Sequence, residues 1–468
     1  MKFSFLFAVV VLGVTFLSVP VITAQSQEQE PGNSLDIKSK ANELGITPGQ
    51  LTQIINSSQN EGNPVGDPLP DAMQERFFTG AAADDRFGFS VSTSGDVNGD
   101  GYSDVIVGAY RNDAGGTDAG RAYIYFGGNV IDNTADVILT GEAAGDYFGF
   151  SVSTAGDVNG DGYSDVIVGA HSNDAGGTSA GRAYIYFGGN VIDNTADVIL
   201  TGTDVNDYFG FSVSASGDVN GDGYSDVIVG AYLNDTGGTS AGRAYIYFGG
   251  NVMNNTPDVR LTGAAVGDYF GYSVCTSGDV NGDGYSDVIV GADLNDTGGT
   301  DAGRADIYFG GVSMDNTADV ILTGEAAGDH FGYSVSAAGD VNGDGYSDVI
   351  VGADGNDAGG TSAGRAYIYF GGNVMDNTAD VILTGAAAGD YLGGSVCTAG
   401  DVNGDGYSDV IVNAEGDDAG GNNAGRAYIY FGGNVIDNTA DVILTGAAAN
   451  DYFGNSVCTS GDVNGDGY

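Results

Sequence analysis

One nine-residue segment recurs along this chain at a constant spacing of 61 residues, and this spacing constrains the fold more than any other feature. The segment DVNGDGYSD begins at Asp96, Asp157, Asp218, Asp279, Asp340 and Asp401, and a shortened copy, DVNGDGY, begins at Asp462. A Thr-Gly pair keeps the same step from Thr79 to Thr445, so no insertion interrupts the array. A chain of equal, uninterrupted repeats folds as a solenoid, a propeller or a related repeat architecture.

Each repeat contains four short segments with the pattern of β-strands. In the first copy, FGFSVSTSG (Phe87–Gly95) alternates large and small residues with a period of two, and RAYIYFGG (Arg121–Gly128) alternates again. DVIVGA (Asp104–Ala109) is a β-branched run typical of a buried strand, and ADVILTG (Ala135–Gly141) closes the unit. With 83 glycines and 42% hydrophobic residues, the chain is too apolar for a disordered polyelectrolyte and too glycine-rich for helical repeats. We therefore expect an all-β fold.

Four strands per repeat favour a β-propeller, whose blades are four-stranded sheets arranged around an axis. A stacked β-helix has a shorter repeat, and its calcium turns would recur more often than once in 61 residues. We predict a seven-bladed propeller over residues 76–468. Arg76–Tyr468 supplies 393 residues where seven full repeats need 427, so we expect the last blade to be incomplete in this chain, as in a shortened reading of a longer one. Arg76–Gly80 resembles the last strand of a blade, so both ends could share the final blade.

The first 75 residues differ from the repeats. Lys2, the apolar run Phe3–Val21 and the small residues before Gln25 predict a secretory signal peptide over 1–24. The run is interrupted and short for a membrane anchor, and no later segment could span a membrane as a helix, so we expect a secreted or cell-surface protein. Residues 25–75 are predicted to be a linker with a short amphipathic helix, which could be a docking element or a spacer.

The charge of the chain limits its partners. A formal net charge of −50, from 63 acidic residues against 13 Lys plus Arg, leaves no basic patch, so we expect no nucleic-acid partner. Such a surface attracts cations instead. Many of the aspartates recur at fixed positions inside one loop, which a surface that is acidic only for solubility would not require.

The recurring segment has the pattern of a calcium loop. Oxygen-bearing side chains stand at positions one, three, five and nine, and the glycine at position six permits a sharp turn. Calcium prefers six to eight hard oxygen ligands, magnesium needs a strict octahedron, and zinc would need His or Cys. Position twelve is Val107 and the chain continues as a strand, unlike a helix-loop-helix calcium motif. The ligands predicted in the first copy are Asp96, Asn98, Asp100, the carbonyl oxygen of Tyr102, and Asp104.

We expect about one calcium ion per repeat. Turn formation alone would explain one such segment but not six complete copies. Each loop gathers three carboxylates that repel one another until a divalent cation neutralises them, so the ion should stabilise every blade. The ligands predicted in the later copies are Asp157, Asn159, Asp161, Tyr163 and Asp165; Asp218, Asn220, Asp222, Tyr224 and Asp226; Asp279, Asn281, Asp283, Tyr285 and Asp287; Asp340, Asn342, Asp344, Tyr346 and Asp348; Asp401, Asn403, Asp405, Tyr407 and Asp409; and Asp462, Asn464 and Asp466.

Three cysteines occupy one equivalent position in different copies. Cys275, Cys397 and Cys458 each lie four residues before a metal loop, where the other copies carry serine. We expect the symmetry of the ring to separate them by a blade spacing, beyond the Cα separation of about 7 Å that a disulfide tolerates. They are therefore predicted to be partly buried thiols without a bridge.

The order of motifs resembles a known repeat. A Phe-Gly pair such as Phe87-Gly88, then DVNGDGYSD, then the Val-Gly-Ala of Val107–Ala109 resembles the FG-GAP repeat of integrin α-subunit propellers and their bacterial relatives. The resemblance implies a seven-bladed propeller with calcium loops on one face and ligand-binding loops on the other. The chain departs from the pattern at Leu392-Gly393, at Asn413, and where proline is replaced by Tyr110, His171, Tyr232, Asp293, Asp354 and Glu415.

Differences between copies gather after Val-Gly-Ala and before Phe-Gly, as at Tyr110-Arg111 and Thr203–Asn206. Both segments should lie opposite the metal loops, where they would contact an extracellular protein or polysaccharide, although drift in exposed loops gives the same pattern. We predict a calcium-binding propeller for adhesion or ligand binding. A calcium-stiffened spacer of a larger surface protein and a polysaccharide-acting enzyme are alternatives. With His171 and His330 as its two histidines and no Ser/His/Asp order, we expect no catalytic residues and no enzyme.

Overall fold

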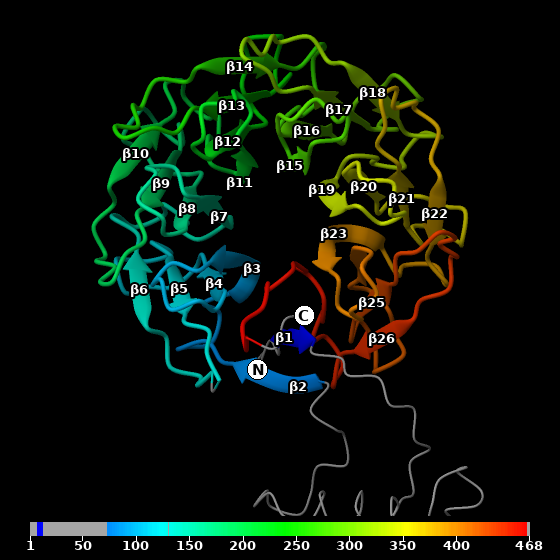
Figure 1. Ribbon diagram of the computed structural model, residues 1–468, viewed down its shortest axis with the longest axis horizontal. Helices are drawn as coiled ribbons and strands as arrows, with labels where there is room; N and C mark the ends of the chain where they lie inside the picture. Colours follow the sequence, from blue (N-terminus) through cyan, green and yellow to red (C-terminus); the bar gives the residue numbers. More distant parts are fainter. Residues whose placement is uncertain (1–6, 13–72, 130, 466–468) are drawn as a thin grey trace, which may run out of the picture. The chain divides into compact units, whose positions relative to one another are not determined.

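The computed structural model describes residues 7–12, 73–129 and 131–465. All the secondary-structure elements in these residues are β-strands. Six four-stranded sheets stand as blades in a ring (Figure 1), which confirms the prediction of an all-β propeller. The described residues contain no helix long and apolar enough to cross a membrane. The predicted helix in 25–75, most of the predicted signal peptide in 1–24 and the ligand Asp466 lie outside these residues.

The strands follow one another blade by blade. A two-stranded sheet is formed by β1 (Phe7–Leu12) and β2 (Met73–Phe78). The blades are β3 (Phe87–Gly95), β4 (Asp104–Ala109), β5 (Arg121–Tyr125) and β6 (Val137–Thr140); β7 (Val152–Gly156), β8 (Asp165–Ala170), β9 (Arg182–Tyr186) and β10 (Val198–Thr201); β11 (Ser212–Gly217), β12 (Asp226–Ala231), β13 (Arg243–Tyr247) and β14 (Val259–Thr262); β15 (Val274–Gly278), β16 (Asp287–Ala292), β17 (Arg304–Tyr308) and β18 (Val320–Thr323); β19 (Ser334–Gly339), β20 (Asp348–Ala353), β21 (Arg365–Tyr369) and β22 (Val381–Thr384); β23 (Leu392–Gly400), β24 (Asp409–Ala414), β25 (Arg426–Tyr430) and β26 (Val442–Thr445).

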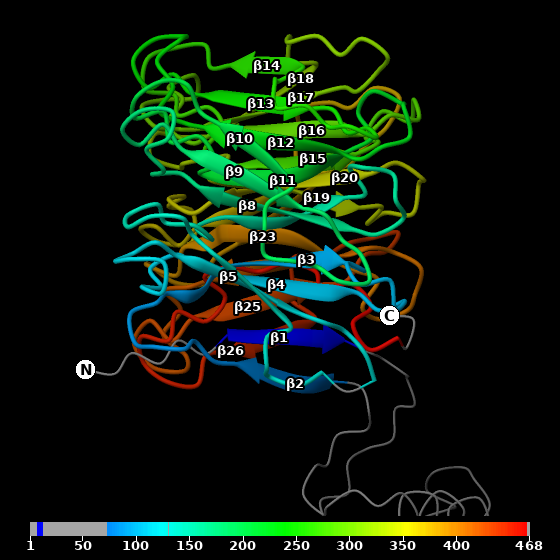
Figure 2. The same ribbon diagram turned by 90° about the vertical axis from the view of Figure 1, so that its left-hand side faces the viewer.

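Each blade is an antiparallel sheet whose strands pair in chain order. Its first strand lies nearest the axis and its fourth strand forms the rim (Figure 1). In the first blade, Val107 pairs with both Val91 and Tyr123, so its side chain lies in the middle of the sheet. The six residues of β4 are all buried, as the run of β-branched residues in DVIVGA predicted. Seen from the side, the strands run across the thickness of the ring and the loops gather on its two faces (Figure 2).

The hydrophobic core lies between blades rather than within them. Ile106, Ile124 and Leu139 of the first blade form one buried cluster with Phe148 and Tyr184 of the second. The alternate side chains of β4 and β5 point to the other side of the blade, where Val105 and Tyr125 form a cluster with Phe78 and Val463. A phenylalanine equivalent to Phe148 is almost fully buried in each of four blades, and burial of such a side chain contributes about 1.5–3 kcal/mol. One repeat therefore cannot bury its apolar faces without its neighbours.

The described residues form six complete blades, so the prediction of seven blades is not supported. The shortened seventh copy has no counterpart of DVIVGA or RAYIY in this sequence, so its first segment has no strand to pair with, and residues 446–465 form none. Between the last blade and the first, Figure 1 shows β1, β2 and the C-terminal segment. Phe78 of β2 packs on Tyr125 with ring centroids 4.1 Å apart. Val463 is fully buried beside Val105, in the role that Val97 has against the second blade.

The three cysteines are free thiols, as predicted, but two of them touch. Cys397 Sγ and Cys458 Sγ lie 3.5 Å apart. The physical reason is that the innermost strands converge on the axis, where a blade spacing is short enough for side chains to touch. Cys275 Sγ likewise lies 3.8 Å from Ser214 Oγ and 3.9 Å from Ser336 Oγ, which are the equivalent residues of the two neighbouring blades.

Neighbouring blades also approach each other through their backbones. Phe148 N donates a hydrogen bond to Ala119 O at 3.0 Å, and Gly120 forms a parallel bridge with Phe148. Gly120 has a φ of 85°, and a Cβ at this position would overlap the carbonyl oxygen of Phe148. Ser90 Oγ adds a hydrogen bond to Gly149 O at 3.0 Å. Glycine at position 120 is therefore required both by the left-handed backbone and by the close approach of the second blade.

We predict that Gly120→Ala destabilises the protein much more than Gly145→Ala. Gly145 has a similar φ of 83°, but a Cβ there meets no atom within 4 Å. The control should lower the free energy of unfolding by about 1 kcal/mol, the penalty for a left-handed alanine. Gly120→Ala should lower it by about 3 kcal/mol, because overpacking against Phe148 is added. Urea denaturation of both variants measures the difference, and equal midpoints would contradict the role of this contact.

Candidate metal centres and the opposite loop face

All six complete DVNGDGYSD segments connect the first strand of a blade to its second, so they lie on one face of the ring. In the first blade, the segment begins just after β3 ends at Gly95 and runs into β4, which begins at Asp104. We call this the metal-loop face. The ends of β4 and β5 that meet near Ala109 and Arg121 lie on the other face, which we call the opposite face.

Within each loop, the side chains at positions one and three fold back onto the backbone. Asp96 Oδ1 accepts hydrogen bonds from the backbone nitrogens of Gly99 and Asp100, at 2.7 and 3.1 Å. Its Oδ2 accepts one from Gly101 N at 2.9 Å, and Asn98 Oδ1 accepts one from Asp100 N at 2.8 Å. The φ angles of Gly99 and Gly101, 76° and 91°, make this tight turn possible. All four contacts recur in the second to fifth loops, and those made by the nitrogens at positions five and six recur in the sixth.

The aspartate at position nine is buried beneath the loop. Asp104 Oδ2 accepts a hydrogen bond from Val97 N at 2.9 Å, and its Oδ1 accepts one from Gly127 N at 2.7 Å. Burial raises the pKa of Asp104 to about 7; the two hydrogen bonds oppose this, and repulsion by Asp100 and Asp96 adds to it. Its carboxylate charge is therefore costly in this environment. By the same causes the pKa is raised to about 7 at Asp165, Asp226, Asp287 and Asp348, and to about 6 at Asp409.

The donor chemistry of the loops fits calcium, since all predicted ligands are oxygen atoms. A carboxylate has about four acceptor sites, and Asp96 and Asp104 use three and two of theirs for the backbone. Among the residues described, however, no three side chains of His, Cys, Asp or Glu form a ready metal cluster. The structure thus places the predicted ligands of each complete loop together without bringing them to one point. Calcium binding stays a prediction, as does the seventh loop.

The first five metal loops also contact the next blade, which the sequence did not reveal. Ser164 N donates a hydrogen bond to Asp96 O at 3.0 Å, and Gly189 N donates one to Val97 O at 2.8 Å. The ring of Tyr163 lies so close to Gly99 that a Cβ there would overlap it. The signals were the glycine at position four and the serine at position eight, which are present in every complete copy. A change in one loop is therefore felt at the neighbouring blade.

The shortened seventh copy docks on the first blade in the same way. Ser103 N donates a hydrogen bond to Asp462 O at 3.0 Å, and Gly128 N donates one to Val463 O at 2.7 Å. A Cβ on Gly465 would similarly lie against the ring of Tyr102. The C-terminal segment therefore reproduces the contact between a metal loop and the following blade.

On the opposite face, aromatic rings form a row that crosses several blades. The ring centroids of Phe150 and His171 lie 4.4 Å apart, as do those of Phe211 and Tyr232. The sequence singled out Tyr110, His171 and Tyr232 at this face but missed the aromatic residues two places after each Phe-Gly phenylalanine, which it assigned only to strands. We define the aromatic row as Phe89, Tyr110, Phe150, His171, Phe211, Tyr232, Tyr272 and Tyr333.

At the position of Tyr110, acidic residues replace the aromatic ones in the last three blades. Asp293, Asp354 and Glu415 occupy the position of Tyr110 in the fourth, fifth and sixth copies. Burial raises the pKa of Asp293 to about 7 and that of Asp354 to about 6, and it also raises the pKa of Glu415. His330 Nδ1 lies 3.8 Å from Asp354 Oδ1. The opposite face is therefore divided into an aromatic part and an acidic part.

The two variable segments of the first copy meet on the opposite face, as expected. Arg111 N donates a hydrogen bond to Asp85 O at 3.2 Å, and Asn112 Nδ2 donates one to Asp85 Oδ2 at 2.7 Å. The segment before Phe-Gly and the segment after Val-Gly-Ala thus form one joint surface.

The family model of the FG-GAP repeat matches residues 87–125, 148–186, 209–247, 270–308, 331–369 and 392–430. The chain belongs to the FG-GAP repeat family. Each matched stretch runs from the Phe-Gly pair, or from Leu392-Gly393 in the sixth copy, to the end of the third strand of a blade. The resemblance inferred from the motifs is confirmed.

Among curated proteins, this FG-GAP chain is similar to integrin alpha subunits. It is 31% identical to integrin alpha-5 of Xenopus laevis over 261 residues, which cover 51% of this chain and 23% of that protein. It is 32% identical to integrin alpha-8 of Gallus gallus, over 48% of this chain and 21% of that protein. For integrin alpha-PS2 of Drosophila melanogaster the values are 34%, 46% and 16%. The chain thus spans less than a quarter of the length of each of these relatives.

We predict that His171 in this FG-GAP ring makes stability fall in mild acid. Burial among Tyr147, Phe150, Tyr208 and Phe211 lowers the pKa of His171 to about 4. The unfolded state, with a pKa near 6.5, binds a proton first, so stability is lost as pH falls from about 6.5 to about 4.

The matched variant is His171→Tyr, because Tyr110 and Tyr232 hold this position in the flanking copies. Between pH 7 and pH 5, the wild type should lose on the order of 1–2 kcal/mol more stability than the variant. Urea denaturation at both pH values measures this. Parallel pH dependences of the two proteins would show that His171 is not buried as described.

Proposed function

We propose that this protein is an extracellular, calcium-binding propeller that binds a ligand through the opposite face and acts in adhesion rather than in catalysis. The observation that carries the proposal is the division between the faces. The metal loops are identical in all six complete copies, whereas the residues of the opposite face differ from copy to copy. A repeated structural device on one side and a varied surface on the other is the arrangement expected of a binding scaffold.

Calcium binding is supported by the charge of the loops. Each complete loop holds three carboxylates, and one of them is buried. Ion pairs in the described part of the chain involve Glu142, Asp306, Glu325, Asp354 and Asp417, all of which lie outside these loops. A divalent cation would neutralise the repulsion within a loop and lower the cost of the buried charge. The side chains at positions one, three, five and nine, with the carbonyl at seven, would hold it.

Ligand binding is supported by what the opposite face exposes. Arg111 is exposed beside Tyr110, with its guanidinium carbon 5.5 Å from the ring centroid. Three large side chains just before the Phe-Gly or Leu-Gly pairs of other copies are also exposed. They are Val205, Val266 and Tyr391, with exposed fractions of 59%, 70% and 42%. Exposed aromatic side chains and arginine are enriched in protein interfaces, and exposed apolar groups add to the surface that binding can bury. We propose an extracellular protein as the ligand class, with polysaccharide as the outcome to be tested beside it.

An extracellular place is supported by two observations. The apolar start of the sequence has the pattern of a signal peptide. The similar curated proteins are integrin alpha subunits, and the resemblance to their propellers implies ligand-binding loops on one face. Adhesion is accordingly the role that we assign to the ring.

One observation favours a second candidate, a polysaccharide-acting enzyme. Asp293 and Asp354 are neighbouring carboxyl groups of raised pKa, and raised carboxyl pKa values are a feature of general acids. Hydrolysis of a polysaccharide panel that is abolished by Asp354→Asn would establish this candidate. Binding without hydrolysis would leave adhesion as the function.

We predict that calcium raises the melting temperature and that a chelator reverses the effect. Calorimetric titration should give about one ion for each complete loop. Asp222→Asn, which removes an exposed carboxylate at position five of the third loop, should lose one site. Asp204→Asn removes one exposed charge from the same copy outside the loop and should keep all sites. Equal stoichiometry in both variants, or a melting temperature that ignores the chelator, would contradict calcium binding.

We predict calcium-dependent binding to a member of a panel of matrix proteins and polysaccharides. The test variant combines Arg111→Ser with Tyr232→His, the residues that the second copy carries at these positions, so the fold is preserved. It should weaken binding at least about 10-fold, the loss of about 1.4 kcal/mol of contact energy. The control Val252→Ala changes an exposed residue on the metal-loop face and should bind as the wild type does. A folded, calcium-loaded protein that binds nothing would favour the structural spacer.

A further inference from the structure

The C-terminal segment closes the ring without being part of a sheet. We call residues 453–465 the terminal arm. Val457 N donates a hydrogen bond to Ser395 Oγ of the last blade at 3.1 Å, and Ser456 Oγ accepts one from Val91 N of the first blade at 3.2 Å. The arm thus bridges the last blade and the first. Both hydrogen bonds join a backbone nitrogen to a serine side chain, so they are not the backbone pairs of a β-sheet.

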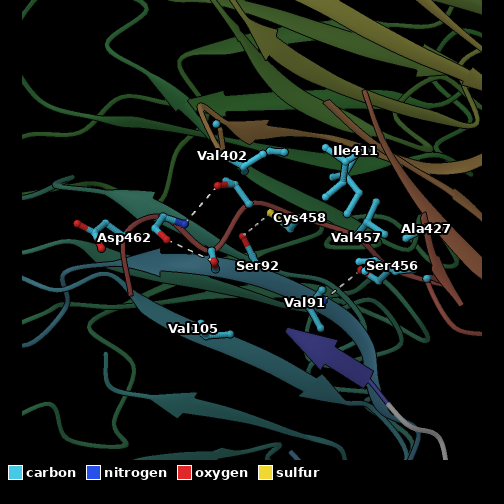
Figure 3. Close-up of a pocket in the computed structure, with 18 of the residues that line it drawn as sticks. Val91, Ser92, Val105, Val402, Ile411, Ala427, Ser456, Val457, Cys458 and Asp462 are labelled. Atoms are coloured by element: carbon cyan, nitrogen blue, oxygen red, sulfur yellow. Dashed lines mark hydrogen bonds between the residues drawn. The ribbon is translucent and has the colours of Figure 1, made fainter. Parts of the chain in front are cut away.

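An apolar cavity lies beside the arm. It has a volume of about 160 Å³ and is lined by Val105 of the first blade and by Ile411, Ile429 and Leu444 of the last. Figure 3 shows Cys458 and Ser456 of the arm at this cavity, between Val91 and Ile411. In the other interfaces, the middle strands of the next blade fill the corresponding space. Packing around the arm is therefore weaker than between complete blades.

The arm brings two sulfur atoms into contact. Cys458 Sγ lies 3.5 Å from Cys397 Sγ of the last blade and 3.8 Å from Ser92 Oγ of the first. Cys275 has serine on both sides instead, at 3.8 and 3.9 Å. Among the seven equivalent positions, the sixth and seventh copies alone place two cysteines next to each other.

The pair has the properties of a reactive dithiol. The hydrogen bond with Cys397 lowers the pKa of Cys458 to about 7, while the same contact and burial raise the pKa of Cys397. Cys458 is half-buried beside the cavity, so a small reagent can approach it. A thiolate, rather than a thiol, is the species that attacks a disulfide.

We propose that Cys397 and Cys458 form a disulfide that joins the terminal arm covalently to the last blade. The sulfur atoms need to approach from 3.5 Å to about 2.05 Å, a shift that an arm outside any strand ladder can make. The arm already contacts the first blade through Asp462 and Val463. The bond would therefore complete a closed connection from the last blade to the first.

The electrons are accepted by a small-molecule disulfide. The Cys458 thiolate attacks one sulfur of that disulfide, forms a mixed disulfide and expels one thiolate. Cys397, after losing its proton, attacks the Cys458 sulfur, forms the intramolecular S–S bond and expels the second thiolate. Two protein thiols are oxidised, one external disulfide is reduced, and the two protons pass to the expelled thiolates. An extracellular location would supply such oxidising conditions, but the chemistry does not depend on the proposed function.

The test is to equilibrate the full chain with glutathione disulfide, denature it, alkylate its free thiols and digest it with trypsin. The three cysteines fall in different peptides, because Arg304 and Arg365 separate Cys275 from Cys397, and Arg426 separates Cys397 from Cys458. Mass spectrometry should find the peptides of Cys397 and Cys458 linked and Cys275 alkylated. Three alkylated cysteines, or a link that includes Cys275, would overturn the proposal.

Serine variants provide the controls, because serine is the residue of the other copies at this position. Cys275→Ser should keep the link, whereas Cys397→Ser and Cys458→Ser should each lose it. Hydrogen exchange of the terminal arm adds a second measurement. Exchange in the arm should slow in the oxidised wild type compared with the reduced protein and should not respond to oxidant in Cys397→Ser. An arm that exchanges equally fast in all these states would contradict ring closure by this bond.

Discussion

Packing between the faces of neighbouring blades holds this protein together. The isoleucine and leucine side chains of one repeat are buried only when the phenylalanine, valine and tyrosine side chains of the next repeat cover them. Glycines such as Gly120 let the backbones of two blades come into contact at the same place. The ring is consequently a set of shared interfaces, and both loop faces depend on how well those interfaces are packed.

Much of this arrangement could be predicted from the sequence. The run DVIVGA is a fully buried strand in five blades, as a β-branched segment without polar alternation indicates. The first strands agree less well. The pattern predicted a strand from the Phe-Gly pair onward, as in β3, but β7 begins only at Val152. Phe148 pairs with Gly120 of the preceding blade, a contact between repeats that the pattern within one repeat cannot reveal.

Three other features were missed for related reasons. Periodicity counts repeats, but a blade forms only where each strand has a partner, and the described residues after Thr445 form no strand. Spacing along the chain gives no distance from the axis, so the contact between Cys397 and Cys458 was not foreseen. The predicted metal ligands of each complete loop lie together but do not meet at one point, so the metal sites stay a prediction. The contact of five complete loops with the next blade depends on Tyr163 and its equivalents, which sequence reasoning considered only for their carbonyl oxygens.

These contacts connect the proposed function to the fold. A cation bound in one loop would act on the blade that holds it and, through the hydrogen bond from Ser164 N to Asp96 O, on the next blade. The packing between the last blade and the first is weaker beside the terminal arm, because an apolar cavity remains there. Covalent closure at the arm and cations in the loops would stabilise the same ring at different points.

Native-state hydrogen exchange of the second strands tests most directly whether the blades share their stability. As denaturant is added, β8, β12, β16 and β20 should lose protection together with their neighbours, because none of them has a core of its own. Exchange of one of these strands while both adjacent blades stay protected would contradict the account, since it would show that a blade can open without uncovering the next.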